Sequence, residues 1–232
     1  DGTKAIRTFD RVLANPPFSL KNWGHDVWST GDKFGRDTYG CPPQSYGDLA
    51  FVQHMLASLK EDGMLGVVLP HGILFRGGAE AKIRKGLLED DLIDAVIGLG
   101  PNLFYGAGIP ACILIIRRNK PTERKGKVLV INGTQELVEG KAQNHLSDAN
   151  VKRFADAFTA FKGEDRFAHV VGLDEIRDND HNLNISRYVS TDEDEEEIDV
   201  AAEVVKLNAL RQQRDEAEAK MMGFLKELGY DG

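Results

Sequence analysis

The chain has 232 residues, 41% of them apolar, which is enough for one ordinary globular domain with an appendage. Its formal net charge of −8 is local, because residues 192–199 hold seven acidic side chains and no basic one. The near-neutral remainder lacks the broad positive field of a protein that grips nucleic acid unaided, so simple basic DNA-coating proteins are excluded. Cys41 and Cys112 predict neither a disulfide framework nor a metal site, and no apolar run approaches ~18 residues. We therefore expect a cytoplasmic protein without a membrane span.

A strand is predicted over residues 9–14, where apolar and β-branched side chains stop abruptly at Asn15-Pro16-Pro17-Phe18. Consecutive prolines neither donate to a sheet ladder nor continue a helix, so the strand ends there. Residues 19–46 are polar and rich in glycine, yet they carry aromatic side chains. This stretch predicts a long loop, which is either a functional lid or a packed irregular excursion.

Strands and helices alternate along the next hundred residues. A helix begins at Asp48, with Gly63 as its stop signal, and a strand follows at 64–69. Further strands are predicted at 92–99, 111–117 and 128–132, and further helices at 79–89 and 151–161. The strands are apolar throughout, which is typical of strands buried on both faces. The alternation predicts an α/β fold.

The carboxyl-terminal segment is different in kind. From Val200, apolar residues recur at a 3-4 spacing, interrupted by Glu203 and Arg214, through positions 200, 207, 210, 217, 221, 224 and 228. This pattern predicts a long helix with an apolar stripe that needs a partner. The partner is either the same domain or another chain.

The strongest chemical signal is Asn15-Pro16-Pro17-Phe18 at the carboxyl end of a strand, the edge where open α/β sheets bind ligands. The Asn15 side-chain oxygen and the Pro16 carbonyl can each accept an N–H from a planar amine such as N6 of adenine. These contacts aim its nitrogen at a methyl donor and stabilise the positive charge that develops. Phe18 supplies a flat face for an extruded base. On these residues alone, an ordinary turn is an equally open interpretation.

Several collinear blocks extend this signal over most of the chain. They comprise Asn15 to Ser19, Pro42-Pro43 to Phe51, Gly63 to Gly72, Ile83-Arg84, Phe104-Tyr105, Gly108 to Ala111 and Asn182 to Tyr188. Together they resemble the modification (M) subunit of type I restriction-modification systems. The resemblance implies an adenine-N6 DNA methyltransferase that uses S-adenosylmethionine and works with a specificity (S) subunit and a restriction (R) subunit. It also assigns the catalytic motif to Asn15, Pro16, Pro17 and Phe18.

The chain departs from the family pattern at its start, since only fourteen residues precede Asn15. The family's cofactor-binding motifs would lie upstream of Asp1, so the chain resembles a carboxyl-terminal portion. We expect a partial class I (Rossmann-like) methyltransferase sheet with a C-terminal helical tail, an exposed first strand, and an inactive isolated fragment. The expected division is a catalytic-side half at 1–135, a domain extension at 136–190, an acidic linker at 191–199 and a subunit-assembly tail at 200–232.

DNA contacts are predicted at several further positions, each with an ordinary structural alternative. His71 follows a buried strand and could touch the base. Trp23 and Arg36 lie in the long loop, where they either close over DNA or anchor the loop. Arg117 and Arg118 open a basic cluster, completed by Lys120, Arg124, Lys125 and Lys127, that faces either phosphates or solvent. The tail helix is expected to join the specificity subunit, which would supply sequence recognition.

Two other function classes remain as alternatives. One is a methyltransferase for guanine N2 in ribosomal RNA or for a protein glutamine amide, since these enzymes present a similar tetrapeptide to a planar amine. The block Asn182 to Tyr188 and the helical tail argue against it. The other is a non-catalytic assembly module.

Overall fold

A computed structural model describes residues 5–190 and 200–228. The chain divides into two compact units, Asp1–Thr191 and Asp192–Gly232. The acidic linker predicted at 191–199 lies outside the described residues.

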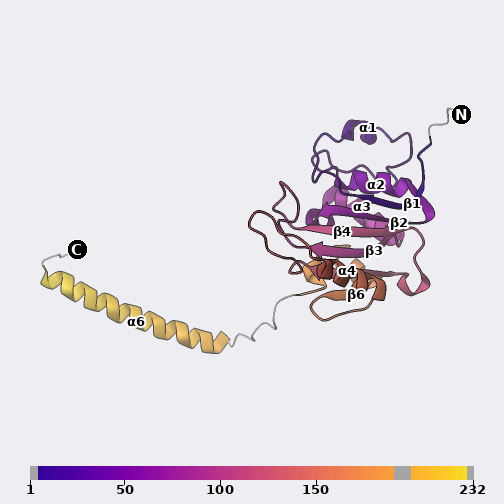
Figure 1. Cartoon of the computed structure of the whole chain (residues 1–232). Helices are drawn as coiled ribbons and strands as arrows, with labels where there is room; N and C mark the ends of the chain where they lie inside the picture. Colours follow the sequence, from indigo (N-terminus) through magenta and orange to yellow (C-terminus); the bar gives the residue numbers. More distant parts are fainter. Residues whose placement is uncertain (1–4, 191–199, 229–232) are drawn as a thin grey trace. The chain divides into compact units, whose positions relative to one another are not determined.

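The first unit is built on a six-stranded sheet with the order β1-β2-β4-β3-β5-β6 (Figure 1). β1 pairs in parallel with β2 and β3 with β5, whereas the β2/β4, β4/β3 and β5/β6 pairs are antiparallel. The strands are β1 Phe9–Ala14, β2 Leu59–Pro70, β3 Ile93–Leu99, β4 Ala111–Arg117, β5 Lys127–Gly133 and β6 Ala168–Gly172. This sheet and its helices confirm the predicted α/β fold.

Helices contribute to apolar clusters on both faces of the sheet. Alternate residues of β3 serve the two clusters: Val96 joins the one that holds side chains of α2 and α3, and Ile97 joins the one that holds Phe154 of α4. The helices are α1 His25–Ser29, α2 Asp48–Ala57, α3 Gly78–Glu89, α4 Asp148–Ala160 and α5 Leu173–Asp178, with 3-10 turns η1 His71–Leu74, η2 Thr122–Arg124 and η3 Ile185–Arg187.

The prediction that Gly63 ends the helix that begins at Asp48 is wrong. The helix α2 ends at Ala57, and β2 already begins at Leu59, which pairs with Phe9 of β1. Gly63 therefore lies inside a strand, where its missing side chain leaves room for Leu59: a Cβ there would come within 2.5 Å of the Leu59 side chain. The short elements α1, β6 and α5 were not predicted, because five or six residues carry too little periodicity to reveal an element.

The strand β1 forms one edge of the sheet and leaves apolar surface uncovered. Its Leu13 side chain is 85% exposed, and Phe9 is exposed as well. An edge strand with unpaired backbone groups and an exposed leucine is a template for pairing with another strand.

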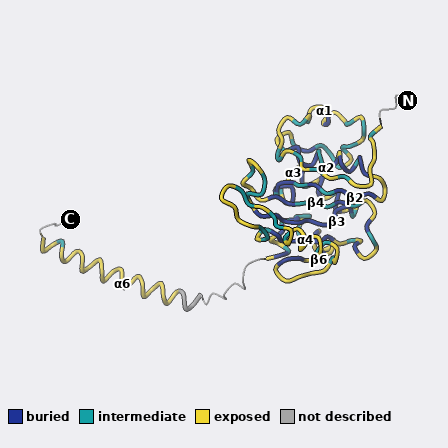
Figure 2. Tube along the Cα trace, in the orientation of Figure 1, coloured by how far each residue is buried: buried dark blue, intermediate teal, exposed yellow. Residues whose placement is uncertain are grey.

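The second unit contains the helix α6, Val200–Glu227. From Val204 onward its described residues are exposed, apart from Leu225, and the tube of this helix is mostly yellow in Figure 2. The exposed apolar residues include Leu207, Leu210, Met221, Phe224 and Leu228, all on the stripe predicted from the sequence. Among the described residues no helix is both long and apolar enough to cross a bilayer.

We expect Leu13→Lys to weaken self-association of this chain, because a charge on an edge strand opposes pairing with a second edge. Val151→Lys is the matched control, since Val151 is also exposed but lies on α4, which packs against β5 toward the other side of the sheet. Sedimentation velocity over a concentration series measures the effect. Equal association of the two variants would show that β1 is not the contact.

Candidate active site

The tetrapeptide Asn15–Phe18 emerges from the sheet at the edge where β2 ends. Ala14, the last residue of β1, pairs with Val67 of β2, which ends three residues later at Pro70. Because β3 ends and β4 begins at this same edge, the connection 100–110 between them also lies there. Two segments some ninety positions apart therefore meet at one end of the sheet.

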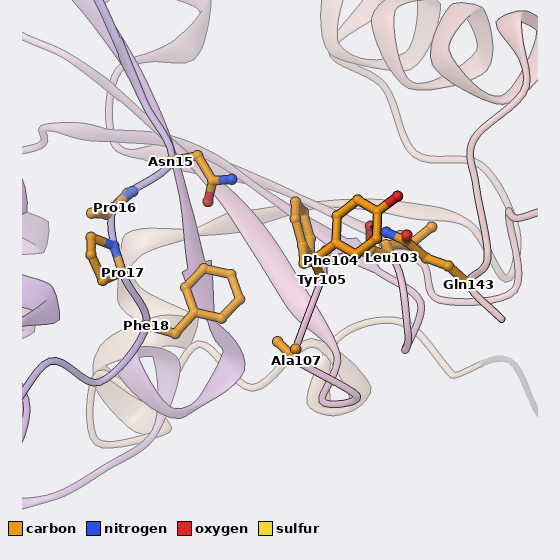
Figure 3. Close-up of a pocket in the computed structure, with 10 residues that line it drawn as sticks. Asn15, Pro16, Pro17, Phe18, Leu103, Phe104, Tyr105, Ala107 and Gln143 are labelled. Carbon is orange, nitrogen blue, oxygen red and sulfur yellow. The ribbon is translucent and has the colours of Figure 1, made fainter.

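A cavity of about 730 Å³ lies between these segments. In Figure 3, Asn15 and Phe18 point toward the space that Phe104 faces from the other side. The rings of Phe18 and Phe104 stand 5.6 Å apart in an edge-to-face arrangement. The lining residues are Asn15, Pro16, Pro17, Phe18, Leu103, Phe104, Tyr105, Gly106, Ala107 and Gln143. The cavity is thus flanked by two aromatic walls, and Tyr105 beside them is 96% exposed.

The polar groups on the first wall are free to bind. Neither the Asn15 side-chain amide nor the Pro16 carbonyl makes a hydrogen bond with any residue that the structure describes. None of the lining residues is a carboxylate, lysine, arginine or histidine. The cavity therefore offers neutral oxygen acceptors beside flat apolar faces.

The tetrapeptide is anchored by a buried carboxylate directly behind it. Oδ1 of Asp48, at the start of α2, accepts the Ser19 backbone N–H at 2.7 Å, and Ser19 has a positive φ of 51°. Asp48 is fully buried, and burial raises the pKa of its carboxyl. Arg76 lies 3.6 Å from Oδ2 of Asp48 and 3.5 Å from Glu80, a second buried carboxylate. This group fixes where the chain turns after Phe18.

His71 is not among the cavity-lining residues. Its Nε2 donates to the Ala111 carbonyl at 2.7 Å, which ties the end of β2 to the start of β4. Burial lowers the pKa of the His71 imidazole, so the ring is neutral at pH 7. Contact between His71 and a base stays a prediction.

The long loop is packed rather than open. Trp23 donates from its indole to the Pro43 carbonyl at 3.1 Å, and Trp28 is buried against it. Arg36 makes a bidentate pair with Asp32, at 2.5 and 3.0 Å, and its guanidinium lies over the Trp28 ring. These contacts hold the loop together, and Tyr39 ties it to the domain through hydrogen bonds with Gln53 and Asp90. A DNA role for Trp23 and Arg36 stays a prediction.

The basic cluster lies at the opposite end of the strands from the cavity. The strand β4 begins at Ala111, at the cavity end, and ends at Arg117. Arg117 and Arg124 both reach the buried Asp94, at 3.3 and 3.1 Å. Arg118 donates to the Leu56 carbonyl. Similar partners hold Lys120, while Lys125 and Lys127 are exposed. Contact of Arg117 and Arg118 with DNA stays a prediction, and this end of the strands does not bring them to the cavity.

Leu103, Phe104 and Gln143 were not predicted as site residues. Phe104 belonged to a block that carried the family resemblance. The sequence feature that could have identified it as a site residue is the aromatic pair Phe104-Tyr105 in a glycine-rich connection. For Leu103 and Gln143 the sequence holds no local signal.

We expect Arg124→Met to lower the free energy of unfolding by about 3 kcal/mol or more, because Asp94 would keep a buried charge with less compensation. The control Lys152→Met removes an exposed pair with Asp156 and should cost under about 1 kcal/mol. Urea titration followed by fluorescence of Trp23 and Trp28 measures both. A loss equal to the control's would contradict the structural role.

Comparison with known proteins supports a methyltransferase assignment. A family model described as N-6 DNA Methylase matches residues 1–197. The type I restriction enzyme MjaVIII methylase subunit of Methanocaldococcus jannaschii is 41% identical over 224 residues, which cover 94% of this chain and 38% of that protein. The MpnII methylase subunit of Mycoplasma pneumoniae is 32% identical over 225 residues, covering 96% of this chain and 41% of that protein.

A solved structure agrees with these relatives. The methyltransferase subunit of a type I restriction-modification system from Streptococcus thermophilus superposes with a TM-score of 0.74 at 40% identity, covering 81% of this chain and 40% of that one. The chain thus spans about two fifths of the length of these relatives. The resemblance predicted from the sequence is confirmed, and the chain belongs to the N-6 DNA methylase family.

Proposed function

We propose that this chain carries the acceptor side of an adenine-N6 DNA methyltransferase, acting as part of the M subunit of a type I restriction-modification complex. The observation that carries the proposal is the pair of unpartnered oxygens, Asn15 Oδ1 and the Pro16 carbonyl, beside a cavity walled by Phe18 and Phe104. The family and its relatives support the reaction class.

In the proposed mechanism, the two oxygens each accept one N–H of the adenine amino group. The nitrogen lone pair is delocalised into the ring, and these hydrogen bonds favour the tetrahedral form in which it becomes a nucleophile. They also stabilise the positive charge that grows on nitrogen during attack. Pro16 and Pro17 restrict the backbone, so the carbonyl is held in place before the base arrives.

The two aromatic walls receive the base. An adenine that leaves the duplex loses stacking worth a few kcal/mol, and a ring beside it offsets part of that loss. Phe18 and Phe104 touch edge to face, so one ring offers a face for stacking and the other an edge against the same base. Because the amine carries its own lone pair, no strong base is required before attack, in keeping with a lining without carboxylate or histidine.

S-adenosylmethionine would supply the electrophilic methyl group and leave as the neutral thioether, and the methylated nitrogen would lose one N–H proton to solvent water after attack. The cavity lining fits the acceptor side alone, because it holds no acidic residue for a ribose and no glycine-rich turn that feeds a helix. We therefore propose that this chain alone transfers no methyl group, and that donor-binding residues must be added to it. We also propose that the complex works in the cytoplasm, where the free thiols of Cys41 and Cys112 stay reduced.

The test uses the full-length protein assembled with a specificity subunit, labelled methyl donor and duplex DNA. We expect Asn15→Ala to lower the rate of transfer about 100-fold or more with DNA affinity nearly unchanged, because the interaction forms mainly in the transition state. Asn15→Asp keeps an acceptor oxygen and should retain more activity than Asn15→Ala. Asn119→Ala, an exposed change at the opposite edge of the sheet, is the control.

The same assay separates the alternatives. Transfer to ribosomal RNA or to protein, with none to DNA, would replace the proposed substrate. No transfer to any of the three acceptors by the assembled complex would favour a non-catalytic assembly module. Transfer by the present chain alone would contradict the proposed need for added donor-binding residues.

We also propose that α6 joins the specificity subunit, with the restriction subunit binding the resulting complex. A soluble helix with an exposed 3-4 stripe is stabilised when a second apolar helix covers that stripe. Leu207, Leu210 and Phe224 are 47%, 62% and 54% exposed, so each has surface to bury. The partner would then recognise the DNA sequence. This division agrees with the near-neutral charge of the first unit, which gives it little affinity of its own for DNA.

We expect simultaneous replacement of Leu207, Leu210 and Phe224 by Asp to abolish co-purification with the specificity subunit while the α/β unit stays folded. The control places the same three charges on the opposite side of the helix, at Asn208, Gln212 and Ala219, which are exposed polar or small residues. Pull-down and tryptophan fluorescence report assembly and folding. Retained assembly of the stripe variant would refute the proposed contact.

A further inference from the structure

The second wall of the cavity stands on a connection with little regular structure of its own. Residues 100–110 run between β3 and β4, and within them Ala107 N–H donates to the Phe104 carbonyl at 3.1 Å. Gly106 adopts a positive φ of 71° at this turn. Long connections without internal ladders are normally mobile, yet Phe104 has to hold its place opposite Phe18.

A pair of amide residues forty positions downstream binds three consecutive carbonyls of this connection. Asn144 donates from Nδ2 to Pro101 O at 3.0 Å and from its backbone N–H to Asn102 O at 2.9 Å. Gln143 donates from Nε2 to Leu103 O at 2.7 Å. The next residue along the connection is Phe104 itself.

This pair, which we call the amide brace (Gln143 and Asn144), is itself held firmly. Val138 and His145 exchange backbone hydrogen bonds of 2.8 and 3.0 Å, which close the segment between them. Oδ1 of Asn144 accepts the Gly140 N–H, which orients the side chain so that Nδ2 faces the Pro101 carbonyl. The amide brace therefore ties the connection 100–110 to the closed segment 138–145.

The brace also reaches the cavity directly. Gln143 lines the main cavity, and it lines an adjoining cavity of about 350 Å³ together with Leu103 and Phe104. Figure 3 shows Gln143 beside Leu103 and Tyr105. The sequence segment 136–146 thus takes part in the site although it belongs to no strand of the sheet.

We infer that Gln143 and Asn144 are positioning residues that hold Phe104 in its edge-to-face contact with Phe18, so that the aromatic surface offered to the acceptor base keeps its shape. The inference rests on the proposed function, because it names what the aromatic walls receive. Misplacement of a bound group by about 1 Å can cost two orders of magnitude in rate, so a brace on one wall acts on the chemical step. Hydrogen bonds to consecutive carbonyls fix both the distance and the rotation of the segment.

Two variants remove single contacts of the brace with little change in shape. Asn144→Asp loses the Nδ2 donor to Pro101 O but keeps the backbone bond and the Gly140 contact. Gln143→Met loses the donor to Leu103 O at nearly constant length, whereas Gln143→Lys keeps a donor there. Gln135→Met, at an exposed glutamine of the same region, is the matched control.

The first measurement needs no activity. Hydrogen exchange of this chain should be faster at the Ala107 amide, which donates to the Phe104 carbonyl, and at the Asn144 amide, which donates to the Asn102 carbonyl, in Asn144→Asp and Gln143→Met. Gln135→Met should exchange like the original chain. Unchanged exchange in both brace variants would overturn the inference, whatever the enzyme does.

The second measurement uses the full-length protein with its specificity subunit, DNA and S-adenosylmethionine. We expect single-turnover methyl transfer to fall about tenfold or more in both brace variants, with Gln143→Lys restoring most of the rate. DNA and donor affinities should stay within about twofold, and 2-aminopurine at the target position should report altered seating of the base. The inference would be overturned if the loss of methyl-transfer rate across the variants simply tracked their loss of melting temperature. It would also be overturned if all variants transferred methyl groups at the same rate. If the original complex transfers nothing to adenine, the proposed function itself fails, while the exchange result still decides the brace.

Discussion

The prolines at positions 16 and 17 impose the constraint on which the site depends. Because neither has an N–H to donate, strand pairing stops at Ala14, and the chain leaves the sheet with the Asn15 amide and the Pro16 carbonyl unpaired. Polar groups at such an edge ordinarily find partners within the protein. Here the turn continues to Ser19, whose N–H is taken by the buried Asp48, so the support lies behind the tetrapeptide and its front stays free.

The two aromatic walls have separate origins, and the sheet sets the distance between them. Phe18 follows β1, whereas Phe104 follows β3, and the strands β2 and β4 lie between. Between them, Val67 of β2 and Leu114 of β4 are buried in one apolar cluster, and the half-buried Ile113 and Ile115 of β4 pack against the cluster on the other face. A close-packed interior changes little in width, so the framework is rigid and the remaining freedom lies in the connections. This is why the supports at Asp48 and at the amide brace matter.

Local patterns in the sequence predicted the framework well, because burial on both faces leaves a continuous apolar run. The strand 111–117 and the helix at 79–89 match the structure almost residue for residue. Contacts between distant segments left no such trace. The density of charge after Arg117 left phosphate contact and solvation both open, and the pairing of this cluster with Asp94 on another strand could not be read from spacing. Gln143 likewise meets the site through a hydrogen bond across forty positions.

The neutral lining of the cavity bears on how the work of the complex would be divided. Oxygen dipoles favour positive charge growing on a nitrogen without holding a fixed counter-charge, so they act more on the transition state than on the resting base. A neutral cavity adds little to the affinity for DNA, because affinity for a duplex comes mainly from phosphate neutralisation. Arg117 and Arg124 form ion pairs with Asp94 inside the protein. In the proposed function, a site of this kind acts once DNA has been delivered to it, and the exposed stripe of α6 is the surface that we propose binds the DNA-reading partner.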